Sequence, residues 1–161
     1  MKAKRQRKLD GLLSVEAAEP PPFASGPRRL KGMAAKGKAY ENKVSALLAR
    51  LNGSGDIPGD LWLGPWFRFE DANGPGLAQP DALLETETKI VIFEAKLKQT
   101  IAAIPQIRLY GQLASALLGK PWVGVQIYRW PSAVRQDTTL FKIEDVVGCD
   151  PGTIHCWHQL L

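Results

Sequence analysis

The most constraining feature of this sequence is an apolar run, Ile90–Phe93, that continues directly into Glu94 and Lys96. Four consecutive large apolar residues are typical of a buried strand. Residues two apart on a strand point to the same face, so Glu94 and Lys96 share a face with Ile92. A carboxylate that continues a buried strand is normally paired or bound to a metal, because desolvating an isolated charge is too costly. The run therefore predicts a central strand with a functional site at its end.

A second carboxylate is expected beside this strand. Residues 79–85 and 89–97 have the composition of two antiparallel strands joined by a turn at 86–88. Folding the pair about residues 87 and 88 brings Asp81 opposite the neighbourhood of Glu94. Two carboxylates with the backbone carbonyl of Ala95 between them suit Mg²⁺, for which Mn²⁺ can substitute, because these ions prefer oxygen ligands. A lysine beside such an ion can orient a water molecule and stabilise developing negative charge, which is the role open to Lys96.

The remaining elements follow from hydrophobic periodicity and from glycine and proline signals. Apolar residues between Tyr40 and Leu51 recur every three or four positions and predict a helix. Together the elements predict an α/β fold with a mixed β-sheet flanked by helices. The predicted order is a helix at 34–51, a strand at 61–69, a Gly/Pro loop at 73–76, strands at 79–85 and 89–97, a helix at 101–118, a strand at 122–129, a short helix or loop at 143–147 and a strand at 153–160.

The combination Pro80-Asp81, then Glu94-Ala95-Lys96, resembles the signature of the PD-(D/E)xK nuclease superfamily. This superfamily includes restriction enzymes, Holliday-junction resolvases and RecB-type exonucleases. Glu41, on the first predicted helix, matches the acidic residue that members carry before the core strands. Gln106 and Tyr110 match the Gln-x-x-x-Tyr element of the RecB-type branch, and their spacing places them on one helical face. The resemblance covers about residues 34–130 and implies a restriction-endonuclease-like fold.

The resemblance also implies a role for each matching residue. Asp81, Glu94, the Ala95 carbonyl and Glu41 would hold the metal, with Glu41 acting directly or through water. Lys96 would position the attacking water. Gln106 and Tyr110 would brace the lysine or contact the phosphate. Contacts with the nucleic acid are expected from basic residues near these motifs, namely Lys36, Lys38, Lys98 and Arg108.

The expected activity is that of a Mg²⁺-dependent deoxyribonuclease, a hydrolase of DNA phosphodiester bonds. The motifs are compatible with an end-processing exonuclease and with a structure-specific or nicking endonuclease. The pathway could be DNA recombination, DNA repair, phage replication or host defence. RNA in place of DNA is also left open. The alternative is a non-catalytic DNA-binding accessory protein that retains the nuclease fold. The expected partner is DNA and not a membrane, and a homodimer could help to enclose it.

Charge is distributed unevenly along the chain. The net charge is +5, but residues 1–38 carry +7, which leaves −2 for residues 39–161. Residues 1–33, with three consecutive prolines from Pro20, are predicted to be a flexible basic arm, and residues 34–161 to be the nuclease-like domain. Such an arm could attract a polyanion or could be a solvated tail.

Aromatic residues and cysteines leave further alternatives. Trp62, Trp66, Phe67 and Phe69 could stack on exposed bases, although alternating aromatics on a strand more often belong to the core. Trp122 and Trp130, at the ends of a predicted strand, are expected to pack in the core. Two cysteines are too few for a disulfide scaffold and favour a reducing, cytoplasmic location, which for a phage-encoded chain would be the host cytoplasm. A zinc-binding module could use four clustered residues near the end of the chain: Cys149, His155, Cys156 and His158.

Overall fold

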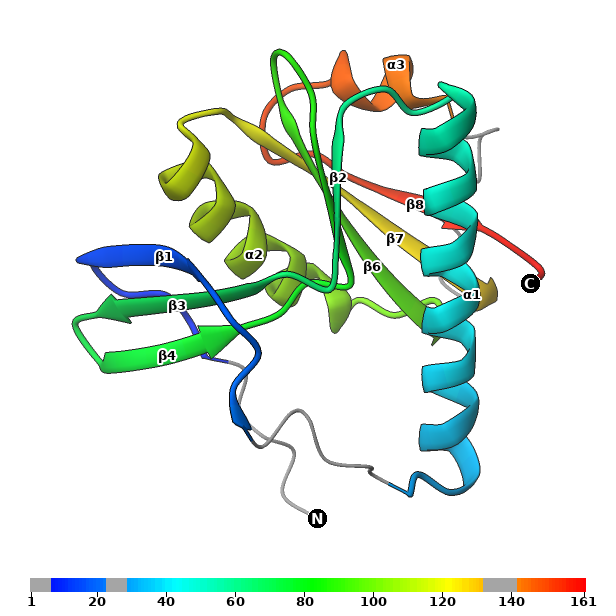
Figure 1. The fold of residues 1–161 in the computed structure, drawn as a ribbon, viewed down its shortest axis with the longest axis horizontal. Helices are drawn as coiled ribbons and strands as arrows, with labels where there is room; N and C mark the ends of the chain where they lie inside the picture. Colours follow the sequence, from blue (N-terminus) through cyan, green and yellow to red (C-terminus); the bar gives the residue numbers. More distant parts are fainter. Residues whose placement is uncertain (1–6, 23–28, 132–141) are drawn as a thin grey trace.

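The computed structural model describes residues 7–22, 29–131 and 142–161, and within these ranges it is a mixed α/β structure with two sheets and three helices (Figure 1). None of the helices in these ranges is long and apolar enough to cross a membrane. The helices are α1 (Gly32–Ser54), α2 (Ala103–Leu118) and α3 (Ile143–Val147). The strands are β1 (Ser14–Ala18), β2 (Asp60–Leu63), β3 (Trp66–Asp71), β4 (Gly74–Ala78), β5 (Ala82–Glu85), β6 (Ile90–Lys98), β7 (Trp122–Trp130) and β8 (Ile154–His158).

The larger sheet has five strands in the order β2-β5-β6-β7-β8 and is mixed, as the sequence predicts. The strands β2, β5 and β6 are antiparallel neighbours, whereas β6, β7 and β8 run parallel. Alternate residues of β6 face opposite sides: Val91 and Phe93 pack with α1, and Ile90 and Ile92 pack with α2. The sheet is therefore covered on one face by α1 and on the other by α2 (Figure 1).

The central hairpin β5–β6 has the register expected from the sequence. Ala82 pairs with Phe93 in the antiparallel ladder, so the preceding Asp81 lies level with Glu94. The turn is closed by Thr86, whose hydroxyl accepts the Lys89 N–H at 3.1 Å. All four residues of Ile90–Phe93 are fully buried. The local pattern thus positions two acidic residues at one point of the sheet.

The predicted single strand at 61–69 is wrong, because the chain leaves the larger sheet in the middle of it. Gly64 adopts a left-handed conformation with φ 56° and separates β2 from β3. The strand β3 is the centre of a second sheet, of order β1-β3-β4. The loop predicted at 73–76 is also wrong, since β4 begins at Gly74, and a side chain on Gly76 would overlap the Phe69 ring.

The prediction of a flexible arm over residues 1–33 is wrong for Ser14–Ala18, which form β1 and pair with β3. The reason is a non-local anchor: the Arg7 guanidinium forms an ion pair with the Asp71 carboxylate and lies over the Phe69 ring. The Asp71 side chain is completely buried and also accepts the Asp10 N–H at 3.1 Å. Residues 1–6 and 23–28 of the predicted arm lie outside the described residues.

Candidate active site

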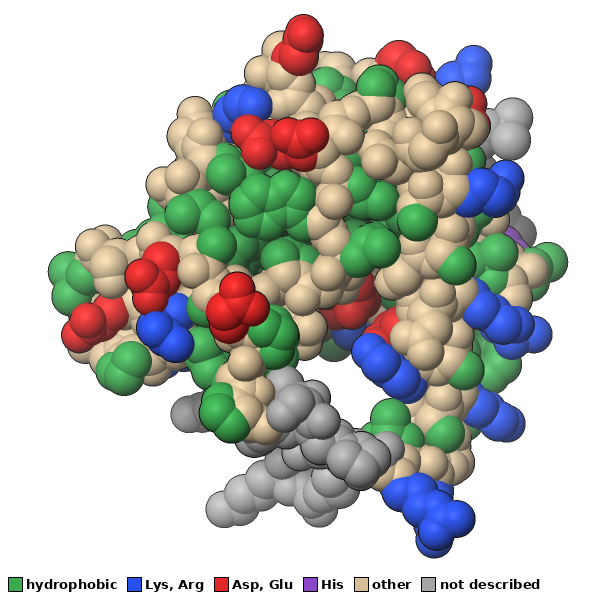
Figure 2. Space-filling model, viewed as in Figure 1, with side chains coloured by type: hydrophobic (Ala, Val, Ile, Leu, Met, Phe, Trp, Pro, Cys, Tyr) green, Lys and Arg blue, Asp and Glu red, His purple; other side chains and the backbone are tan. Residues whose placement is uncertain are grey.

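A polar cavity of about 400 Å³ lies where α1, the β5–β6 hairpin and the β2–β3 connection meet. In Figure 2, acidic and basic side chains are visible in the hollow between α1 and the strands. The residues that line the cavity include five of the six predicted catalytic residues. The complete lining is Lys38, Glu41, Asn42, Ser45, Leu63, Gly64, Gln79, Pro80, Asp81, Glu94, Lys96 and Gln106.

The two strand-borne carboxylates are held in different ways. Oδ2 of Asp81 accepts the backbone N–H of Ala95 at 2.7 Å, a bond that crosses from the β5 end to β6. Oε1 of Glu94 accepts from the Lys96 ammonium at 2.7 Å. Oε2 of Glu94 has no hydrogen-bond partner among the described residues, although the Glu94 side chain is only 3% exposed. A buried carboxylate oxygen without a protein partner is costly, so this oxygen is suited to accept a further ligand.

Both carboxyl groups have raised pKa values. Burial is the main cause of the increase at Asp81, and the nearby Glu41 charge adds to it. At Glu94 burial again comes first, followed by repulsion from Asp81, while the Lys96 ammonium opposes the increase. One lysine therefore does not compensate two buried acids. A further positive charge, a proton or a metal cation, would relieve the repulsion.

Helix α1 contributes one acidic and one basic side chain to the cavity. The Lys38 ammonium donates to Glu41 at 3.0 Å, an i,i+3 ion pair on the exposed helix surface. Lys36 does not line the cavity, although the sequence suggests it as a nucleic-acid contact beside Lys38. Residues two positions apart on a helix are separated by about 200° around its axis, so Lys36 and Lys38 point in roughly opposite directions.

Helix α2 contributes the Gln-x-x-x-Tyr pair. The side-chain amide of Gln106 donates to the Tyr110 hydroxyl at 2.9 Å, as their one-turn spacing predicts. Gln106 lines the cavity, whereas Tyr110 is buried behind it and is 8% exposed. Burial raises the pKa of the Tyr110 hydroxyl, and the Glu94 charge adds to this effect, so the hydroxyl remains protonated.

The two other predicted nucleic-acid contacts lie outside the cavity. Arg108 lines a separate hollow of about 220 Å³ between α2 and the N-terminal segment, where Arg7 and Lys8 also lie. Lys98 is exposed at the end of β6, two residues beyond Lys96. The structure thus places Lys38 at the cavity and the other three basic residues, Lys36, Lys98 and Arg108, away from its lining.

Sequence reasoning assigned no role to Gln79 and Gly64, which brace the acidic loop. The Gln79 amide donates to the Gly64 carbonyl at 3.1 Å, and the Gly64 N–H donates to the Asp81 carbonyl at 2.9 Å. Both bonds connect the β2–β3 link to the loop that carries Asp81. The only sequence signal for the role of Gln79 was its position directly before the Pro80-Asp81 motif. The role of Gly64 had no such signal, because it depends on where β2 ends and β3 begins.

The donor set fits a hard divalent cation better than it fits zinc. Within the described ranges, no group of three or more His, Cys, Asp or Glu side chains lies close enough together to hold a metal ion. Glu41 therefore forms an ion pair with Lys38 and does not complete a set of three clustered carboxylates. Mg²⁺ keeps several waters and commonly binds through one or two carboxylates, so Asp81 and Glu94 with its unpartnered oxygen are sufficient protein ligands.

The predicted zinc cluster is not assembled in the described residues. The Cys149 thiol donates to the Asp145 carbonyl at 3.1 Å. The His158 ring stacks on Tyr128, and its Nε2 lies 2.8 Å from the Arg129 carbonyl. These side chains are used separately, as expected for packing along an edge strand. The zinc-module alternative is therefore not supported by the geometry.

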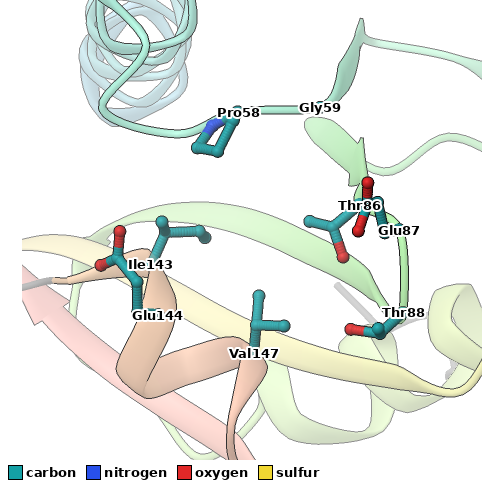
Figure 3. A pocket seen from close by; sticks show the side chains of 8 residues that line it. All are labelled: Pro58, Gly59, Thr86, Glu87, Thr88, Ile143, Glu144 and Val147. Carbon is teal, nitrogen blue, oxygen red and sulfur yellow. The ribbon is translucent and has the colours of Figure 1, made fainter.

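A second hollow, of about 520 Å³, lies at the other end of the β5–β6 hairpin (Figure 3). Ile143 and Val147 of α3 point towards Pro58, and the turn residues Thr86 and Thr88 close one side. This hollow has a largely apolar lining and includes none of the predicted site residues. The smaller polar cavity is therefore the better candidate for acid-dependent chemistry.

Comparison of the chain with protein-family models, curated proteins and solved structures found no match. The function must therefore be argued from the geometry and chemistry of the cavity.

Proposed function

We propose that this protein is a metal-dependent nuclease of the PD-(D/E)xK class, with a restriction-endonuclease-like fold, that hydrolyses DNA phosphodiester bonds in the cytoplasm. The observation that carries this proposal is the unpartnered, buried Oε2 of Glu94, level with Asp81 and adjacent to Lys96 in a polar cavity. Such an arrangement is unfavourable without a compensating positive charge and favours a bound cation. Few structural roles would require two acids to be buried beside one another.

The metal ligands in this proposal are the carboxylates of Asp81 and Glu94, together with the Ala95 carbonyl. Glu41 would join them through water after release from Lys38, because its carboxylate lies on the same cavity wall. Mg²⁺ or Mn²⁺ bound there would polarise a phosphate oxygen and lower the pKa of a water molecule.

In this proposal, side chains that line the cavity position the water molecule and stabilise negative charge on the phosphate. The Lys96 ammonium reaches Glu94 at 2.7 Å and is 29% exposed, so it can orient a water molecule at the cavity mouth and stabilise negative charge on the phosphate. Lys38, on α1 next to Glu41, adds a second cation to the cavity lining. The Gln106 amide nitrogen donates to the Tyr110 hydroxyl and the Gln106 side chain lines the cavity, so its amide oxygen would be the group available to accept from a water molecule.

The first test is cleavage of four labelled DNAs: a linear duplex, a single strand, a nicked circle and a four-way junction. Each is incubated with Mg²⁺, with Mn²⁺ and with chelator. We expect metal-dependent cutting by the wild type and a loss of at least about a hundredfold in Lys96→Ala, since removing one charge-stabilising donor costs about that much. Lys142→Ala, at an exposed lysine just before α3 that does not line the cavity, is the matched control and should cut normally.

Metal binding can be tested without activity. Mg²⁺ should raise the melting temperature of the wild type because it binds the folded state, and it should not do so in Asp81→Asn. Full cleavage by Lys96→Ala would refute the proposed site. Absence of cutting together with absence of a Mg²⁺-dependent thermal shift would refute the proposed activity.

A second candidate function is DNA binding without cleavage. It is favoured by one observation, a row of exposed basic residues along α1 at intervals of seven: Lys36, Lys43 and Arg50. Basic side chains gather along this outer edge of α1 in Figure 2. Residues seven apart lie on one helical face, so the row could follow a phosphate backbone without involving the cavity. Salt-sensitive DNA binding with no cutting under any metal condition would support this candidate.

A further inference from the structure

Trp130 is an exposed aromatic residue at the carboxyl end of β7. It is 40% exposed, whereas the other four tryptophans are partly buried, so the expectation that Trp130 packs in the core is wrong. Ile101, in the segment that follows β6, is 68% exposed. The Gln99 N–H donates to the Trp130 carbonyl at 2.9 Å and ties the two segments together. Exposed large apolar side chains on two linked segments are typical of a contact surface.

The register of β6 and β7 places Trp130 on the same face of the sheet as the candidate site. In this parallel pair, Lys96 is level with Tyr128 and Lys98 is level with Trp130. Because side chains alternate along a strand, Glu94, Lys96 and Lys98 share the face on which Trp130 lies. Four residues of strand correspond to about 13 Å, which is the distance along β6 from the level of Glu94 to that of Trp130.

Two basic residues lie next to Trp130. The Arg129 guanidinium lies 5.9 Å from the centroid of the Trp130 ring, and Lys98 is exposed on the adjacent strand. Residues 95–131, which run from the end of the candidate site through α2 to the end of β7, contain no aspartate or glutamate. An aromatic face next to basic side chains is complementary to a nucleic-acid strand.

We infer that Trp130 and Lys98 bind an unpaired stretch of DNA next to the cleavage site, with a base stacked on the indole and a neighbouring phosphate on the lysine. This inference rests on the proposed function and specifies its substrate. The face of a base inside a duplex is covered by its stacked neighbours, so a tryptophan platform selects single-stranded DNA. The substrate is therefore DNA with a single-stranded end or flap rather than intact duplex.

The test is equilibrium binding of a fluorescent oligothymidylate and of a matched duplex, measured in chelator so that no strand is cut. Trp130→Ala should weaken binding of the single strand by roughly tenfold and leave duplex binding nearly unchanged. Trp130→Phe should recover most of the affinity because it restores an aromatic face, whereas Trp130→Leu should not. Circular dichroism and melting curves of all variants establish that each is folded.

The salt dependence separates the two contacts. Lys98→Ala should reduce the slope of log affinity against log salt by about 0.7 for the single strand, as expected for one phosphate contact, and Trp130→Ala should leave the slope unchanged. Lys142→Ala has the same charge change at an exposed residue outside every proposed DNA contact and is the matched control. Equal single-strand affinity in Trp130→Ala and wild type, or equal losses for single strand and duplex, would overturn the inference.

The outcome is independent of whether the protein cuts DNA. Trp130-dependent binding without cleavage would support the platform and refute the hydrolytic function. Cleavage with no dependence of binding on Trp130 would support the function and refute the platform.

Discussion

At the level of single residues, the feature that most distinguishes this chain is the pair of buried carboxylates. Burial raises the pKa of both Asp81 and Glu94, and their mutual proximity raises the pKa of Glu94 further. The charged forms of both residues are therefore less favourable in the folded state than in the unfolded chain. Each unit of such a shift corresponds to about 1.4 kcal/mol, so the pair lowers the stability of the metal-free protein at neutral pH.

Asp81→Asn is therefore predicted to stabilise the metal-free protein. Asparagine keeps an oxygen that can accept the Ala95 N–H and removes the buried charge. The Asp81 pKa is higher in the folded state than in the unfolded chain, so between these two pKa values the folded protein binds more protons. The free energy of unfolding of the wild type therefore falls as pH rises above about 4. At pH 8 in chelator, the free energy of unfolding of Asp81→Asn should exceed that of wild type by on the order of 1 kcal/mol, about 2–4 °C in melting temperature.

The advantage of Asp81→Asn should disappear near pH 4, where the wild-type carboxyl group is protonated, and saturating Mg²⁺ should reverse it. Urea unfolding at both pH values is the measurement. A destabilised Asp81→Asn at pH 8 would show that the carboxylate is satisfied within the protein and needs no cation.

At the level of elements, the packing of α2 against the sheet depends on close approach at one position. Gly111 is buried in α2, and a Cβ there would overlap the Trp122 indole. In α1 the situation differs, since a Cβ on Gly37 would meet no atom within 4 Å. The two helical glycines thus provide a matched pair in which the same substitution has opposite consequences.

Gly111→Ala should lower the free energy of unfolding by about 1–3 kcal/mol, because overpacking outweighs the gain in helix propensity. Gly37→Ala should raise it by up to about 1 kcal/mol, since alanine favours the helix and nothing obstructs the methyl group. Chemical denaturation of both variants checks these values. Equal effects in the two helices would show that α2 does not pack as closely on Trp122 as described.

The success of sequence reasoning also differed among elements. The hairpin β5–β6 was predicted correctly because its register follows from a short turn and an uninterrupted apolar run. The sheet β1-β3-β4 was missed because its central strand pairs with residues 48 to 56 positions earlier, and because β4 begins with Gly-Pro-Gly. In the cavity, the motif residues were identified from the sequence. The bracing of Asp81 by Gly64 was not, since it requires knowledge of where the chain changes sheets.

At the level of the whole molecule, the N-terminal segment is part of the folded structure. Burial alone would raise the pKa of the Asp71 carboxyl group, but hydrogen bonds from Arg7 and from the N–H groups of Asp10 and Asn73 together lower it. The segment therefore binds the second sheet through a charge pair as well as through the β1–β3 ladder. Removing the segment to test its role in DNA binding would also remove a strand.

Arg7→Ala should destabilise the protein, because it leaves the buried Asp71 carboxylate without its charged partner. The adjacent Lys8→Ala has the same charge change at an exposed side chain and should leave stability close to that of wild type. Melting temperatures should differ between the two variants by several degrees. Similar melting temperatures would indicate that the ion pair contributes little and that the β1–β3 ladder alone holds the segment.

The buried acid pair also has an evolutionary consequence. A lineage that no longer used the cavity would gain stability by replacing either Asp81 or Glu94, so mutation and selection for folding would both remove the pair. Its persistence in a descendant would therefore record continued selection for what the acids do. Related sequences would accordingly be most informative at positions 81 and 94, where stability and the proposed activity favour opposite residues.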